Sequence, residues 1–149
     1  MGILTDLVAA TDADVERIAR SQVPSQQFSG VDIKGIDTVK LGTLHSLLTG
    51  DDFEALLSQY DPVFEVSEDG PWVSRIPPAL QSRLASMDAT EMRRVADLWA
   101  ATEEFKLDEW QPADVARVLE SICTLATRAD AAGQTLFLCR RRSKQCPLL

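Results

Sequence analysis

The sequence is poor in cysteine and histidine and short of basic residues. Its 149 residues include three cysteines, one histidine and 15 lysines and arginines, against 23 aspartates and glutamates, for a formal charge of −8. Three cysteines cannot all pair with one another, so a disulfide scaffold is not expected and a reducing, cytoplasmic location is predicted. The shortage of lysine and arginine argues against a nucleic-acid-binding protein, because phosphate backbones attract clustered basic side chains.

Long hydrophobic runs are missing too. The longest uncharged segments, residues 21–31 and 41–50, are shorter than the ~20 apolar residues of a membrane-spanning helix. Asp6 interrupts the only early apolar stretch and no basic segment precedes it, so no secretory signal is predicted. Hydrophobic residues still make up 45% of the chain, which excludes a wholly disordered protein and suits one folded domain.

Familiar catalytic and cofactor-binding motifs do not occur in the sequence. It contains no Gly-x-Ser-x-Gly nucleophile motif, no Gly-x-x-x-x-Gly-Lys phosphate loop and no Gly-x-Gly-x-x-Gly dinucleotide fingerprint. It has no Cys-x-x-Cys pair either, so a structural zinc site is not expected. We therefore predict neither a metal nor a cofactor.

What the sequence does contain is a regular succession of helix and strand signals. Strands are expected over residues 3–8, 31–33, 63–66, 72–76 and 135–139, with a loop over 22–30. The Asp-Gly-Pro turn between the third and fourth strands predicts a hairpin with a five-residue loop. Six helices are expected, opening near residues 11, 37, 51, 77, 88 and 112.

These elements predict a single α+β domain over residues 1–139, with about six helices and a small mixed sheet that includes the central hairpin. A basic C-terminal tail is expected over residues 140–149. The helix that begins at Pro112 has the longest apolar stripe, at the spacing of a helix face packed on a core: Val115, Val118, Leu119, Ile122, Leu125, Ala126 and Ala129.

Four strings of residues resemble those of the YfbM-like family of small bacterial proteins of unknown function. They are Gly-Val-Asp-Ile-Lys-Gly-Ile-Asp at 30–37, Lys-Leu-Gly-Thr-Leu-His-Ser-Leu-Leu-Thr-Gly at 40–50, Glu-Asp-Gly-Pro-Trp at 68–72 and Ala-Ala-Gly-Gln-Thr-Leu-Phe-Leu at 131–138. The resemblance covers most of the chain. It implies a fold type and a bacterial, cytoplasmic origin, and it supplies no mechanism.

His45, the only histidine, lies on or beside the apolar stripe of its helix. We interpret it as a buried, hydrogen-bonded core residue. The alternative is a general base or ligand in a pocket, with nearby acids such as Glu104. Cys123 falls on the inward face of the last helix, where a thiol usually packs without reacting, so a catalytic Cys-His pair is not predicted.

Two acidic and aromatic segments are candidate binding sites. Asp69 and Trp72 flank the hairpin turn, and Glu104 lies beside Phe105 in the second segment. Each aromatic residue either covers the edge of the core or anchors a basic partner or ligand among carboxylates. We favour packing, and we interpret most of the acidic clusters as solvated surfaces or helix caps rather than cation sites.

The last ten residues contain four bases and no acid. Cys146 begins a Cys-Pro-Leu-Leu ending that matches the motif for geranylgeranylation, next to a basic cluster that would add an electrostatic membrane signal. Prenylation requires eukaryotic enzymes, so in a bacterial protein this motif would act only inside a host cell. A chance match is the interpretation we prefer.

Three functional hypotheses follow. Residues 1–139 contain 11 bases against 23 acids, a formal charge of −12, which favours a non-enzymatic protein that binds a basic partner as toxin-neutralising immunity proteins do. The second hypothesis is a small-molecule-binding protein or enzyme with a pocket around His45. The third is a protein targeted to host membranes through Cys146.

Overall fold

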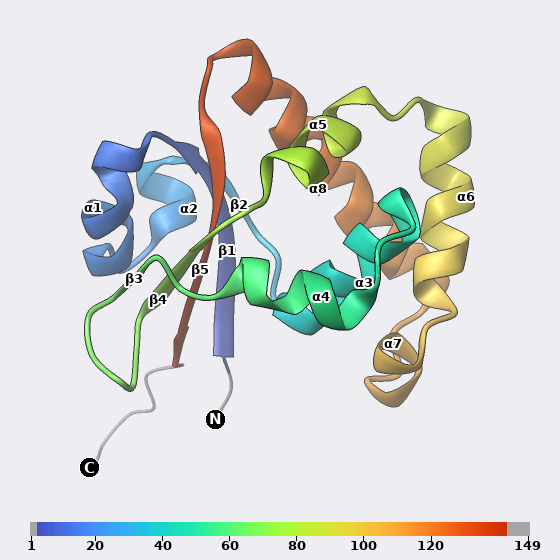
Figure 1. Cartoon of the computed structure of the whole chain (residues 1–149), viewed down its shortest axis with the longest axis horizontal. Coiled ribbons are helices and arrows are strands. Elements are labelled where there is room, and N and C mark those ends of the chain that lie inside the picture. Colours follow the sequence, from blue (N-terminus) through green and yellow to red (C-terminus); the bar gives the residue numbers. More distant parts are fainter. Residues whose placement is uncertain (1–2, 143–149) are drawn as a thin grey trace.

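The computed structural model describes residues 3–142, in which five strands form one sheet in the order β2-β1-β5-β4-β3 (Figure 1). The strands are β1 (Ile3–Ala10), β2 (Ser29–Asp32), β3 (Phe64–Glu65), β4 (Trp72–Arg75) and β5 (Thr135–Arg142). The two longest strands, β1 and β5, are neighbours at the centre of the sheet and pair from Ile3 with Arg142 to Ala10 with Thr135. This central pair contains most of the buried strand residues.

The α+β class is confirmed, and the sheet is antiparallel throughout rather than mixed. Each of the four strand pairs in the described residues is antiparallel, because β5 enters between β1 and β4 in the direction opposite to both. The predicted hairpin is present as β3 and β4 and forms one edge of the sheet. Strand β5 continues three residues beyond the expected end at Cys139, through Arg142.

Eight α-helices lie within the described residues, two more than expected. They are α1 (Val15–Arg20), α2 (Pro24–Gln27), α3 (Thr38–Thr49), α4 (Phe53–Leu57), α5 (Pro78–Ser86), α6 (Ala89–Ala100), α7 (Glu103–Leu107) and α8 (Pro112–Ala131), with single 3-10 turns at Asp12–Asp14 and Ser58–Tyr60. The two additional helices, α2 and α7, have four and five residues. Helices this short have too few turns to produce a periodic apolar pattern; α4, which is as short as α7, was expected because an aspartate cap precedes it.

Aspartate side chains begin three of the helices. Asp37 accepts a hydrogen bond from the Lys40 backbone N–H at the start of α3, and Asp88 accepts one from Glu91 at the start of α6. Asp52 caps α4 in the same way. At the other end of α3, Gly50 adopts the left-handed conformation, with φ of 79°, which residues with a side chain rarely adopt.

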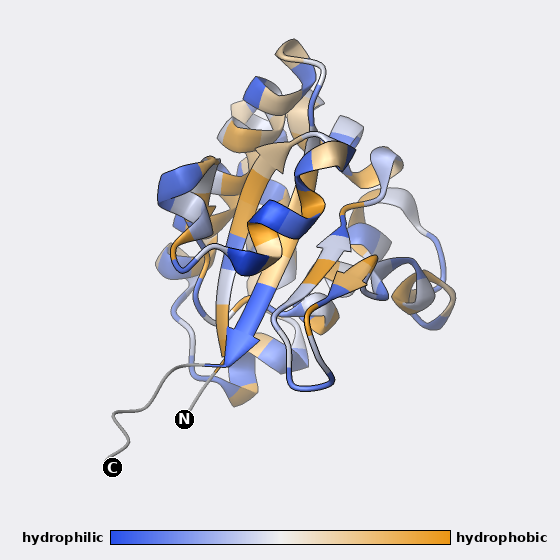
Figure 2. Cartoon of the chain, turned by 90° about the vertical axis from the view of Figure 1, so that its left-hand side faces the viewer, coloured by the Kyte–Doolittle hydropathy of each residue, from blue (hydrophilic) through white to orange (hydrophobic). Residues whose placement is uncertain are grey.

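The sheet separates two unequal helical layers (Figure 1). Helix α8 lies against β1, β2 and β5 on one face and also packs on α5 and α6, with α3 next to them. Helices α1 and α2 cover part of the other face; α1 contacts β3, β4 and β5, whereas α2 contacts β1 and β2. Figure 2 views the molecule from the side of these two short helices.

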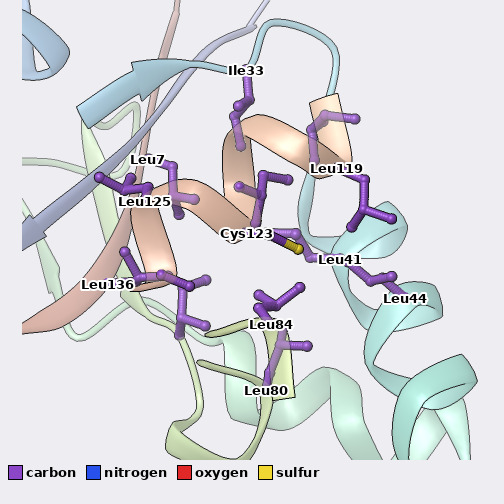
Figure 3. Packing of buried hydrophobic residues seen from close by; sticks show 14 of the residues in the cluster. Leu7, Ile33, Leu41, Leu44, Leu80, Leu84, Leu119, Cys123, Leu125 and Leu136 are labelled. Atoms are coloured by element: carbon purple, nitrogen blue, oxygen red, sulfur yellow. The ribbon is translucent and has the colours of Figure 1, made fainter. Parts of the chain in front are cut away.

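The larger core lies between α8, α3, α5 and the sheet (Figure 3). Six of the seven residues in the predicted stripe of α8 are fully buried, and Val118 packs against the core at its edge. Cys123 lies in the middle of this core, among leucines from α3, α5 and α8. A smaller cluster on the opposite face joins α1 to the sheet: Val8, Ala10, Ile18, Ala19, Val73, Phe137 and Cys139.

Candidate functional site

His45 is a core residue. Its side chain is 1% exposed, and its Nδ1 atom lies 3.0 Å from the hydroxyl oxygen of Tyr60, which is also buried. Burial lowers the pKa of the imidazole, an effect that the negative charge of Asp51 partly opposes. The hydrogen bond joins α3 to the 3-10 turn at Ser58–Tyr60, so His45 connects two elements inside the protein, with its ring closed off from solvent.

Glu104 lies at a shallow groove on the surface. Its Oε1 atom accepts a hydrogen bond of 3.1 Å from the Thr43 hydroxyl, which joins α7 to α3. The groove has a volume of about 340 Å³, and we call it the α3–α7 groove; its lining is Thr43, Ser46, Leu47, Phe53, Thr102, Glu103 and Glu104. His45 and Glu104 therefore do not share one pocket, although Thr43 and Ser46 flank His45 on α3.

Lys40 holds α7 in place beside this groove. It is 3% exposed, and its Nζ atom donates a 2.7 Å hydrogen bond to the Gly35 carbonyl oxygen and pairs with the Asp108 carboxylate. The ammonium also lies 5.3 Å and 5.8 Å from the ring centres of Phe105 and Trp110, a geometry in which cations are attracted to aromatic rings. One buried cation thus connects the start of α3 to the middle of α7 and to the residues that follow this helix.

Trp72 is covered by arginines of its own chain. The Arg140 and Arg142 guanidinium groups lie 5.6 Å and 5.9 Å from its ring centre. Arg142 also comes within 3.7 Å of the Asp69 carboxylate. Asp69 and Trp72 thus both lie near Arg142, and the cations that they contact belong to β5 of the same chain.

A larger pocket lies between the hairpin turn, the end of α1 and the end of β5. Its volume is about 730 Å³, and we call it the arginine pocket; its lining is Leu4, Ala19, Arg20, Ser21, Gln22, Val23, Val66, Asp69, Gly70, Pro71, Arg141 and Arg142. Except for Asp69, none of these residues was a predicted site residue. The basic run after Cys139 was the available signal, but it was assigned to a tail outside the domain, whereas Arg140–Arg142 complete β5.

Nucleophilic and metal-ligating groups are dispersed in the described residues. Cys123 and Cys139 are both buried, and burial raises the pKa of the Cys123 thiol to about 12 and that of Cys139 to about 11. A thiol with so high a pKa is protonated at neutral pH and is a poor nucleophile. Between residues 3 and 142 no three histidine, cysteine, aspartate or glutamate side chains are close enough to hold a metal ion. Cys146 lies outside the described residues.

Comparison with known proteins identifies no relative: the chain matches no family model, no curated protein and no solved structure. The resemblance to YfbM-like proteins thus stays a prediction. Within residues 3–142, no helix has the length and apolar content that crossing a membrane requires.

Proposed function

We propose that this protein is a non-enzymatic interaction module that binds a basic segment of a partner protein in the α3–α7 groove. The observation that carries the proposal is the combination of apolar and acidic side chains in this groove. Leu47 is 38% exposed and lies there with Phe53, and Glu103 and Glu104 line the same groove. An amphipathic basic segment would bury the apolar pair and place its cations against the carboxylates.

Further acids extend this surface beyond the groove. Asp52 and Glu54 flank Phe53 in the sequence, and the backbone carbonyl of Asp51 accepts a hydrogen bond from Ser46 in the groove lining. Among the described residues, no lysine or arginine forms an ion pair with these three acids or with the two glutamates of the groove. A basic partner would therefore meet carboxylates that no described basic side chain neutralises, and the charge would speed its approach.

The hydrogen bond between Thr43 and Glu104, together with Lys40, supports a preformed groove. Both contacts hold α7 against α3 before any partner arrives. A surface that is already ordered loses little conformational entropy on binding. This favours recognition of a partner segment by a rigid surface, as in the neutralisation of a basic toxin by an immunity protein.

The test uses a lysine- and leucine-containing amphipathic peptide as the probe, titrated calorimetrically into the full chain at low and high salt. Leu47→Asp removes the apolar contact, and we expect at least tenfold weaker binding. Leu98→Asp is the matched control, because Leu98 is 45% exposed and lies on α6 outside the groove lining. The control should bind as the unmodified protein does.

A second pair of variants tests the charges. Glu103→Gln with Glu104→Gln should weaken binding about fivefold at low salt, since exposed ion pairs contribute up to about 1 kcal/mol in total here, and the difference should shrink at high salt. Asp97→Asn with Glu120→Gln removes two exposed acids outside the groove lining. Equal weakening by the two pairs would show general charge attraction and would overturn the assignment to this groove.

A further inference from the structure

The sheet face that carries α1 and α2 is open at one end. Burial along the central strands decreases toward this end: Thr5 to Ala10 are buried in β1, whereas Leu4 is only partly buried and Ile3 is exposed. Strand β5 shows the same change, from buried Leu136–Cys139 to partly buried Arg141 and exposed Arg142. In Figure 2 the hydrophilic end of β5 extends past the two helices. The arginine pocket lies at this end.

The lining of the arginine pocket is basic, whereas the protein as a whole is acidic. Arg20, Arg141 and Arg142 line the pocket, and Asp69 is the single acid of the lining. Arg20 also pairs with Glu16, outside the lining, at 2.9 Å, so Arg141 and Arg142 are the cations that face an incoming ligand. The described residues as a whole have a formal charge of −9, because Lys144 lies outside them. Arginines that converge on one pocket of an acidic protein indicate an anionic ligand, since the guanidinium group matches carboxylate and phosphate geometry.

Contacts within the protein leave donors on Arg141 and Arg142 available. Arg141 uses one nitrogen, Nη1, to donate a 3.2 Å hydrogen bond to the Ser21 carbonyl oxygen, which orients the side chain along the pocket wall. The Arg142 side chain is 61% exposed and 3.7 Å from Asp69, which is 85% exposed, so this pair is easily rearranged. A guanidinium group has five N–H donors, and a bound anion can accept from those that remain.

The rest of the pocket lining is largely apolar. Leu4, Ala19 and Pro71 lie in the pocket with Val23 and Val66, which are 41% and 40% exposed. Covering such side chains removes apolar area from water and so stabilises a complex. A simple inorganic anion would leave this apolar surface in contact with water, whereas a ligand with an apolar body would cover it.

We propose that the arginine pocket binds an anionic amphiphile, a molecule with an apolar body and one carboxylate or phosphate group. The apolar body lies against Leu4, Val23 and Val66, and the anionic group accepts hydrogen bonds from Arg141 and Arg142. The pocket and the α3–α7 groove have no lining residue in common. The amphiphile and the proposed protein partner would therefore occupy separate sites.

The experiment titrates decanoate, below its micellar concentration, into the full chain by calorimetry. We expect saturable binding with one site, and at least tenfold weaker binding of acetate, which lacks the apolar body, and of 1-decanol, which lacks the charge. Vesicles containing an anionic phospholipid form a separate arm that distinguishes a membrane headgroup from a free amphiphile. Binding to vesicles without binding of decanoate would overturn the proposal, as would equal binding of decanoate and acetate.

Substitutions locate the site. Arg141→Gln should weaken decanoate binding about tenfold, the effect of one charge-assisted hydrogen bond, and Arg128→Gln, an exposed arginine of α8, is the matched control. Val23→Ser should also weaken binding, whereas Leu98→Ser should not. Should Arg141→Gln unfold the protein, Arg142→Gln replaces it, because that side chain is mostly exposed. Binding that survives all the pocket variants unchanged would refute this location.

Discussion

Gln81 completes the sheet at the point where β4 ends, and its loss has a predictable cost. The side chain is 6% exposed. Its Oε1 atom accepts a 2.9 Å hydrogen bond from the Leu136 backbone N–H, and its Nε2 atom donates to the Gln134 carbonyl oxygen and to Asp130. The last paired residue of β4 is Arg75. The next residue, Ile76, still donates its N–H to the Leu136 carbonyl oxygen at 2.9 Å, and the Gln81 side chain supplies the acceptor for the Leu136 N–H in place of the Ile76 carbonyl.

Gln81→Met keeps the length of the side chain and removes all three hydrogen bonds. The Leu136 N–H is fully buried and would lose its partner, which costs about 1–3 kcal/mol, and the Gln134 carbonyl would add to this. Asp130 is exposed and regains water at little cost. We expect a loss of about 3 kcal/mol in the free energy of unfolding, or about 10 °C in Tm for a chain of this size.

Urea unfolding followed by circular dichroism measures the free energy, and hydrogen exchange measures the protection of the Leu136 amide. Gln59→Met is the matched control, because Gln59 is exposed, and it should change the stability by less than about 0.5 kcal/mol. A loss below about 1 kcal/mol in Gln81→Met, or an unchanged exchange rate at Leu136, would show that the Gln81 side chain is not needed as the acceptor for the Leu136 N–H.

Three further predictions concern a buried cation, a titration and a tight contact. Asp108→Ala should destabilise the protein by about 2 kcal/mol in urea unfolding, because it leaves the buried Lys40 ammonium without its carboxylate. Lys40→Met should cost less, because Asp108 is 54% exposed and is hydrated once Lys40 is gone. The reverse order would contradict this account. Burial lowers the pKa of His45 from 6.5, so this histidine binds a proton more readily in the unfolded state than in the folded one. The free energy of unfolding should therefore fall as the pH drops below 6.5, and it should fall less steeply in His45→Gln. Parallel pH profiles of the two proteins would refute this prediction. Gly30→Ala places a Cβ atom 2.6 Å from the Leu7 carbonyl oxygen and should lower Tm by several degrees, whereas an unchanged Tm would show that β2 shifts freely.

Local signals were sufficient to predict most elements of the fold. The aspartates that begin α3, α4 and α6 act on backbone N–H groups within three residues, so their effect is visible in a short stretch of sequence. The Asp-Gly-Pro turn of the hairpin is local in the same sense. The antiparallel order of the sheet was not predictable in this way, because strand pairing joins residues far apart in the chain, such as Ile3 and Arg142.

The interpretation of His45 as a hydrogen-bonded core residue agrees with its position. Its place beside an apolar stripe made burial foreseeable, whereas the partner Tyr60 lies fifteen residues away on another element. Trp72 was predicted to cover the edge of the core rather than to bind a basic partner; its ring lies beside Arg140 and Arg142, and a role at the core edge stays a prediction. Arg140 and Arg142 belong to β5 because this strand pairs with β1, and the sequence near residue 140 contains no local signal for that pairing.

The sequence by itself determined the acidic character of the chain, the main helices with their caps, and the absence of familiar catalytic motifs. Only the tertiary structure determined which charged side chains lie close together. It continued β5 through Arg142, placed Arg141 beside the end of α1, and brought Glu104 to Thr43 across two helices. Helix caps and hydrophobic periodicity involve residues that are close together in the chain, so the sequence shows them directly. A binding surface is formed by distant segments, which come together only when the whole core has packed.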